Sequence, residues 1–137
     1  MNSNSSIAPL FGRILFSTVF LFSGLTKVMA FSMMSGFAQA KGMPFPTLMI
    51  AGAAALEILG GLALLSGFQT RITAWILFVY LIPTTLIFHN FWTLTGAGQQ
   101  DALVHFLKNL AIMGGLLIVA TFGAGAYSLD NRAAAKA

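Results

Sequence analysis

Residues 46–67, PTLMIAGAAALEILGGLALLSG, form an apolar run with a single acid, Glu57, near its middle. At about 1.5 Å per residue, a helix of this length spans the ~30 Å hydrocarbon core of a bilayer, with Glu57 close to the midplane. An ionised carboxylate at that depth costs on the order of 3 kcal/mol, and each Leu or Ile of the run returns roughly 0.5 kcal/mol. Insertion is therefore only marginally favourable, and the acid is not expected to face lipid.

Small residues share the helix face of the acid. Four of them lie three or four positions before or after Glu57: Ala53, Ala54, Gly60 and Gly61. Residues at these spacings stack on one side of a helix, and small side chains let neighbouring membrane helices approach closely. The pattern predicts that Glu57 points into a helix bundle and needs partners there.

The composition indicates one integral membrane domain. The chain has 137 residues, of which 58% are hydrophobic and only 7% are charged, and its mean hydropathy is +0.87. Soluble domains carry about a quarter charged residues. The net charge of +4 comes from scattered single bases, so no nucleic-acid partner is expected. The absence of cysteine excludes disulfide exchange, thiolate-bound iron–sulfur clusters and covalently attached c-type haem within this chain.

Hydrophobic runs predict an all-α membrane protein, an antiparallel bundle of four transmembrane helices in contact with the lipid bilayer. The expected spans are residues 7–29, 47–67, 72–91 and 102–122, followed by a polar tail at 123–137. Residues 68–71 are too few to leave the interface, so the second and third spans form a hairpin. The connector at 30–45 either lies at the interface or enters the membrane partway. Pro83 predicts a kink in the third span.

The distribution of basic residues predicts the orientation. Four spans place both termini on one side of the membrane. That side carries Arg13, Arg71, Arg132 and Lys136, and the opposite side carries Lys27 and Lys41. The positive-inside rule therefore favours both termini in the cytoplasm.

Polar residues gather in the non-cytoplasmic half of the expected bundle. They are Lys27, Glu57, His89, His105, Lys108 and Asn109. We expect Glu57 to pair with Lys108, with His89 as a neighbouring donor or acceptor, around a cavity beside Pro83. Plainer interpretations also exist. Arg13 and Lys27 could be snorkelling residues at helix ends, and the buried pair of Glu57 and Lys108 could serve only to fix the packing of the bundle. No ligand spacing supports a metal site at the two histidines.

The chain resembles the DoxX family of small bacterial four-helix inner-membrane proteins. The resemblance rests on GRILFSTVFLFSGLTKV at 12–28, LEILGGLALLSGFQTR at 56–71, FHNF at 88–91 and KNLAIMGGLLIVATFGAGAYSLD at 108–130. The family's recurring polar and small positions fall on Arg13, Gly24, Lys27, Glu57, Gly60, Gly61, His89, Lys108, Asn109 and Gly115.

The resemblance implies a redox-linked role in the bacterial inner membrane. The family takes its name from a membrane subunit similar to thiosulfate:quinone oxidoreductase components, and related members are linked to oxidative-stress complexes with soluble redox enzymes. The first hypothesis is therefore a quinone-linked subunit, whose electrons come from a partner or a bound reductant. Glu57, His89 and Lys108 would act on the quinone, and the ring would be held by Lys27, Gly60, Gly61, His105 and Asn109.

Two alternatives stay open at this point. The chain could be a non-enzymatic scaffold that recruits a soluble oxidoreductase through its cytoplasmic turn and basic tail. It could also be a small proton-coupled transporter with Glu57 as the titrating group, which four spans allow most readily in a homo-oligomer. Neither the oligomeric state nor the substrate follows from the sequence.

Overall fold

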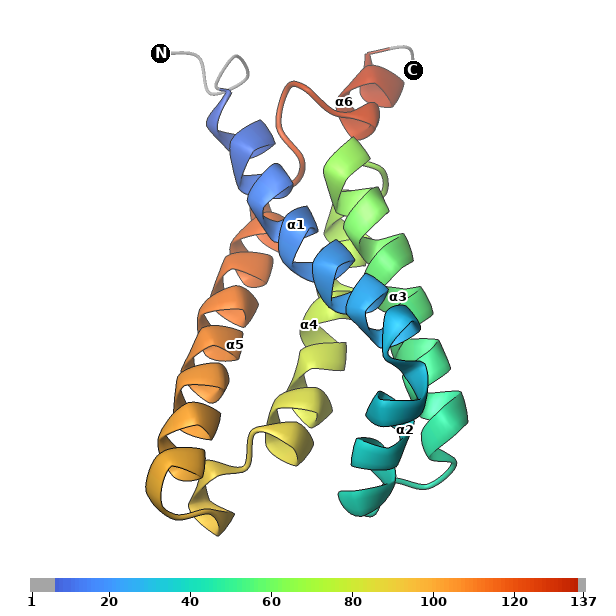
Figure 1. Cartoon of the computed structure of the whole chain (residues 1–137). Helices are drawn as coiled ribbons and strands as arrows, with labels where there is room; N and C mark the ends of the chain where they lie inside the picture. The colour runs from blue at the N-terminus through green and yellow to red at the C-terminus, as the bar shows by residue number, and fades with distance from the viewer. Residues whose placement is uncertain (1–6, 136–137) are drawn as a thin grey trace.

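Four long helices cross the molecule in an antiparallel bundle (Figure 1). In the computed structural model, which describes residues 7–135, all four are long and apolar enough to span a membrane. They are α1 (Ala8–Met29), α3 (Pro46–Ser66), α4 (Thr70–Phe88) and α5 (Gly96–Phe122). Three short helices accompany them: α2 (Phe31–Ala40), the 3-10 turn η2 (Phe91–Thr93) and α6 (Leu129–Ala134). The four-helix membrane architecture predicted from the sequence is confirmed.

Helix α5 begins earlier than the hydrophobic pattern predicts. Its first residue is Gly96, whereas the apolar run starts at Ala102. A helix of 27 residues is about 40 Å long, and this exceeds the ~30 Å hydrocarbon core. The polar residues 96–101 therefore form helical turns beyond the apolar part of the span.

The turn between α3 and α4 makes these helices antiparallel neighbours. Gly67 takes a left-handed conformation with φ 69°, and Phe68 N–H donates to the carbonyl of Ala63 at 2.9 Å. A glycine in this position ends a helix because it has no Cβ to clash. Only residues 67–69 separate the two helices, as expected for a hairpin.

Helix α1 crosses α3 at a large angle (Figure 1). Arg13 and Lys27 lie 14 residues apart, about 21 Å along α1. They nevertheless bond to Leu64 and Glu57, which are about 11 Å apart along α3. Such convergence requires a steep crossing, and it carries the end of α1 toward the middle of α3.

Glycines permit close packing where α1, α3 and α4 meet. A Cβ on Gly24 would lie 2.7 Å from Ile58 Cγ1 and 3.1 Å from the carbonyl oxygen of Ala54. On α3, Gly61 is in similar contact with Leu21 of α1, and Gly60 with Leu77 of α4. The small-residue face therefore lies inside the bundle, as predicted, and packs against α1 and α4.

Replacing Gly24 with Ala is expected to destabilise the protein by about 1–3 kcal/mol, because the new methyl group overpacks the α1–α3 crossing. Gly52 of α3 has no atom within 4 Å of an added Cβ. Gly52→Ala should therefore be neutral or stabilise by up to about 1 kcal/mol through helix propensity. Thermal unfolding in detergent measures both. Equal effects of the two changes would contradict the close packing at Gly24.

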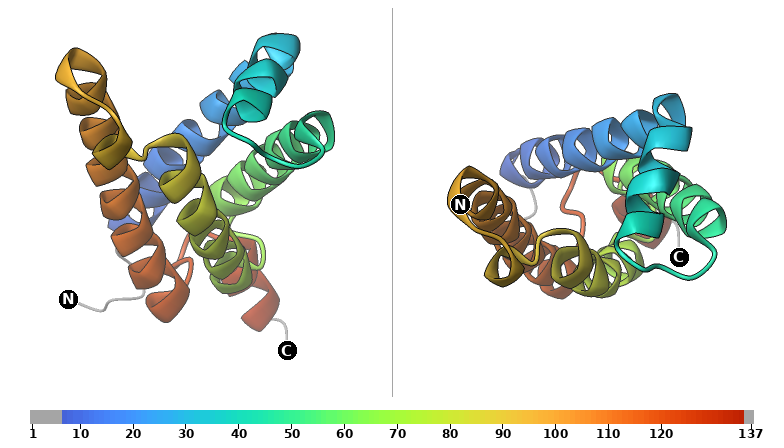
Figure 2. Two further views of the ribbon diagram at one scale, coloured as in Figure 1. Left: turned by 90° about the horizontal axis from the view of Figure 1, so that it is seen from below. Right: turned by 60° about the horizontal axis from the view of Figure 1, so that its bottom comes forward.

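The two pairs of long helices diverge toward the end that carries α2 and η2 (Figures 1 and 2). At that end α2 packs on α3 and reaches the end of α4. The rings of Phe37 and Phe88 lie 5.7 Å apart, and Lys41 Nζ donates to Asn90 Oδ1 at 2.9 Å. Residues 31–40 thus pack against α3 and the end of α4.

Candidate functional site

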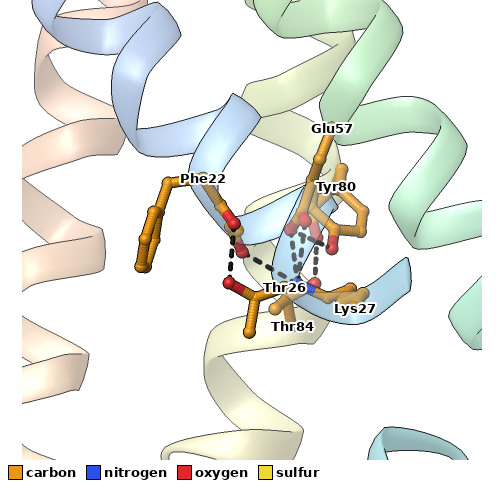
Figure 3. Close-up of polar contacts among 7 residues, drawn as sticks. Phe22, Thr26, Lys27, Glu57, Tyr80 and Thr84 are labelled. Carbon is orange, nitrogen blue, oxygen red and sulfur yellow. Dashed lines mark hydrogen bonds and ion pairs between the residues drawn. The ribbon is translucent and has the colours of Figure 1, made fainter. Parts of the chain in front are cut away.

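Glu57 forms a buried ion pair with Lys27 (Figure 3). The carboxylate is 3% exposed, and the Lys27 ammonium donates to Oε1 at 3.0 Å and to Oε2 at 2.8 Å. The same ammonium donates to Ser23 Oγ at 2.8 Å. Ser23 is one turn before Lys27, so α1 supplies both the charge and a second acceptor for it.

A phenol completes this group from α4. Tyr80 donates its hydroxyl to Glu57 Oε1 at 2.7 Å, and its own carbonyl accepts from Thr84 Oγ1 at 2.9 Å (Figure 3). Glu57 lies about 14 Å and Tyr80 about 12 Å from the nearer end of its helix, so both side chains start near mid-membrane depth. Three helices therefore converge on one carboxylate. We call Ser23, Lys27, Glu57 and Tyr80 the midplane cluster.

The midplane cluster satisfies its own charges. Two oxygens accept three hydrogen bonds, and the ammonium donates to a carboxylate and a hydroxyl. Such pairing is what makes an ion pair tolerable at low dielectric. The Lys27 side chain keeps 17% of its surface exposed against 4% for Glu57. A small molecule could thus approach the cluster from the ammonium side.

The partner predicted for Glu57 was wrong. Lys108 is exposed on α5, and its ammonium lies 2.9 Å from His105 Nδ1. Lys27 takes the place assigned to Lys108, because the steep crossing of α1 carries the end of that helix to the middle of α3. For the same reason Lys27 is not a snorkelling residue at an interface.

The remaining candidate residues form a second group between α4 and α5. The imidazole rings of His89 and His105 stack with centroids 5.2 Å apart. One turn closer to the bilayer centre, the buried Asn109 donates from Nδ2 to Thr85 Oγ1 at 3.0 Å. We call His89, His105, Lys108 and Asn109 the α4–α5 group.

The polar residues that we expected in one site therefore form two separate groups. Thr85 follows Tyr80 by five positions, which turns it by about 140° around the helix. On α4, Tyr80 consequently points toward the midplane cluster with α1 and α3, whereas Thr85 points toward α5 and the α4–α5 group. Gly60 and Gly61 contribute close packing beside Glu57. The predicted cavity beside Pro83 is also not among the two pockets described below, since Pro83 lines neither.

Arg13 ties the C-terminal segment to the bundle. It is 2% exposed; its Nη1 donates to the carbonyls of Leu64 and Leu65 at 3.3 and 3.2 Å, and its Nη2 donates to that of Tyr127. The last carbonyls of a helix lack partners within it and favour a cation. Arg13 is therefore not the snorkelling residue that we expected. The C-terminal segment is also not a simple polar tail, since residues 124 and 128 are buried.

Asp130 caps the first turn of α4. Its oxygens accept from the backbone N–H groups of Gln69 and Thr70, both at 2.8 Å. Burial alone would raise the pKa of Asp130, but the N–H group and side chain of Thr70, the N–H group of Gln69 and the Arg13 charge hold that pKa below its ordinary value.

The protein is expected to lose stability in acid through Asp130. A lowered pKa in the folded state means that the capping contribution is complete above the unfolded pKa of about 4 and is lost as pH falls through the folded value. Asp130→Asn should flatten this part of the curve of melting temperature against pH. Asp101→Asn, at an exposed position in α5, is the matched control. An acid limb that persists unchanged in the Asp130 variant would contradict this assignment.

Sequence reasoning missed two members of the midplane cluster. Ser23 lies four residues before Lys27, a spacing that itself signals contact on a helix. Tyr80 stands within an apolar span, where a phenolic hydroxyl must find a partner. Both signals were available in the sequence.

Fold and site together define a small four-span integral membrane protein whose centre holds a lysine–glutamate–tyrosine group. The DoxX family model matches residues 8–90, and the chain belongs to this family. It is 32% identical to inner membrane protein YphA of Escherichia coli over 90% of this chain and 88% of that protein. It is 35% identical to inner membrane protein YqjF of the same organism over 96% of this chain and 95% of that protein. Among solved structures, none matches the chain. The chain is thus a DoxX-family inner membrane protein.

Proposed function

We propose that this protein is the membrane subunit of a redox system and binds a quinone at the midplane cluster. The observation that supports the proposal is the convergence of a carboxylate, an ammonium and a phenol near mid-membrane depth, from three different helices. Quinone carbonyls need hydrogen-bond donors in an apolar surrounding, and their two-electron reduction takes up two protons. Tyr80 and Lys27 are donors of the required kind.

In this proposal the ion pair holds the donors ready for a quinone carbonyl. Lys27 and Tyr80 both donate to Glu57, and a bound carbonyl would compete for one of these donors. Protons taken up by the reduced ring would come from the same groups. The electrons would come from a soluble oxidoreductase or a bound reductant, since no electron carrier is visible in the sequence.

The α4–α5 group has a secondary place in the proposal. His89 and His105 stack close to the end of α4, and the exposed Lys108 lies beside them. In the proposal these residues would hydrogen-bond with water at that end of the membrane, without touching the quinone.

Purified protein should bind ubiquinone or menaquinone, and Tyr80→Phe should weaken binding about tenfold, the equivalent of one lost hydrogen bond of ~1.4 kcal/mol. Tyr127→Phe is the matched control, because the chain has two tyrosines and Tyr127 is 58% exposed. Titration of quinone into the detergent-solubilised protein measures the affinities. A protein that neither retains nor binds either quinone would overturn the proposal, as would equal losses in both variants.

A second candidate function rests on a different observation. The midplane cluster is satisfied internally, as expected if its charges only fix the packing of the bundle. The protein would then be a scaffold, with its termini in the cytoplasm, that recruits a soluble redox enzyme through the α3–α4 turn and the C-terminal segment. Deleting the chain from Asn131 onward should abolish recovery of that enzyme while leaving the melting temperature of the bundle nearly unchanged. Unaffected recovery would count against the scaffold.

A further inference from the structure

A polar cavity of about 490 Å³ lies at the end of the bundle that carries the termini. We call it the terminal cavity. It is lined by residues 69–72, at the start of α4, and by the returning C-terminal segment within residues 122–131. Because this is where a span leaves the hydrocarbon, the terminal cavity lies at the depth of lipid headgroups.

One charged donor that lines the terminal cavity has no side-chain partner within residues 7–135. The Arg71 side chain makes no hydrogen bond or ion pair in the part of the chain that the structure describes. Its guanidinium lies over Gly123, where an added Cβ would be 3.2 Å from Nε. The Arg71 side chain is exposed, so the cavity presents a cationic donor that suits a negatively charged ligand.

The acid in the terminal cavity does not neutralise this positive charge. Asp130 directs both carboxylate oxygens at the backbone N–H groups of Gln69 and Thr70. Those N–H groups begin α4 and carry the positive end of its dipole. Arg71 is therefore left to interact with an anion from outside the protein.

An apolar groove of about 580 Å³ adjoins the terminal cavity. It runs between α3 and α4, and Gln69 and Ile72 line both spaces. Its walls are mainly leucine, isoleucine and alanine side chains such as Leu59, Ala63 and Ile76. A polar, cationic cavity continuous with an apolar groove matches a molecule with an anionic head and a hydrocarbon chain.

We propose that this surface holds one anionic phospholipid. Its phosphate accepts hydrogen bonds from the Arg71 guanidinium, and one acyl chain lies in the groove between α3 and α4. The lipid would hold the α3–α4 turn and the C-terminal segment together, because residues of both line the terminal cavity in which its headgroup lies. This site is separate from the midplane cluster and stands whether or not a quinone binds there.

Delipidated protein in detergent should show the preference directly. Phosphatidylglycerol is expected to raise the melting temperature by several degrees more than phosphatidylcholine with the same acyl chains. Native mass spectrometry should show Arg71→Gln binding phosphatidylglycerol about tenfold more weakly than the unchanged protein. Arg132→Gln removes the same charge from the same end, outside the cavity, and should retain the preference.

Two further arms keep the test decisive. Ala63→Phe fills the groove and leaves Arg71 in place, so it should weaken phosphatidylglycerol binding even where Arg71→Gln fails to fold. Glycerol 3-phosphate, which has the anionic head without chains, should not stabilise the protein. Equal stabilisation by the two lipids, equal losses in the Arg71 and Arg132 variants, or full stabilisation by glycerol 3-phosphate would each overturn the phospholipid site.

Discussion

Lys27→Met is expected to destabilise the protein by about 3–5 kcal/mol, because it leaves the carboxylate of Glu57 buried without its counter-charge. Glu57→Gln should be milder, at about 1–3 kcal/mol. Gln can still accept from Tyr80, and the remaining ammonium keeps its hydrogen bond to Ser23. Thermal and denaturant unfolding in detergent measure both changes.

The double variant separates a real pair from two independent losses. Lys27→Met with Glu57→Gln removes both charges together, so part of the loss should be recovered. Lys108→Met is the matched control, since that ammonium is exposed and bonds only to His105 in the described residues. Its effect should stay within about 0.5–1 kcal/mol, as for other exposed changes. A strictly additive double variant, or a Lys108→Met loss as large as that of Lys27→Met, would contradict the ion pair.

The burial of Glu57 could be predicted from the sequence because it follows from the residues next to it in the chain. An acid at mid-membrane depth flanked by small residues has few alternatives to the inside of a bundle. Its partner depended on something else, the angle at which α1 crosses α3. Span positions alone suggested that Lys27 lies at the interface, and only the steep crossing brings it to Glu57.

The order of helices around the bundle also limited the prediction. A hydrophobicity pattern does not say which of two helices faces a given side of α4. Tyr80 and Thr85 lie on different sides of that helix, so the polar residues expected in one site divide between the midplane cluster and the α4–α5 group. The polar C-terminal segment gave even less information, because its docking depends on long-range bonds such as that from Asp130 N–H to the carbonyl of Gly67, at 2.9 Å.

Arg13→Met is expected to destabilise the protein by about 3–5 kcal/mol, because three carbonyls lose a buried, charged donor at once. Arg13→Lys should restore little of this. A lysine ammonium is a compact point charge, whereas the guanidinium presents a planar fork that reaches the end of α3 and Tyr127 at once.

The loss of stability in the Arg13 variant should be concentrated in the C-terminal segment. Such a local loss distinguishes the bonds of Arg13 to the end of α3 and to Tyr127 from a general packing role. Hydrogen exchange should accelerate at the amides of Thr70 and Asp130, which bond across the junction, and should stay unchanged in α2 at the far end. Arg132→Gln, an exposed change in α6, should leave both regions protected. Uniform acceleration throughout the bundle would contradict the tie. If only the C-terminal segment is released, the proposed phospholipid site, which includes residues 122–131, should be lost as well. The midplane cluster, some 10 Å further along α3, should keep its ion pair.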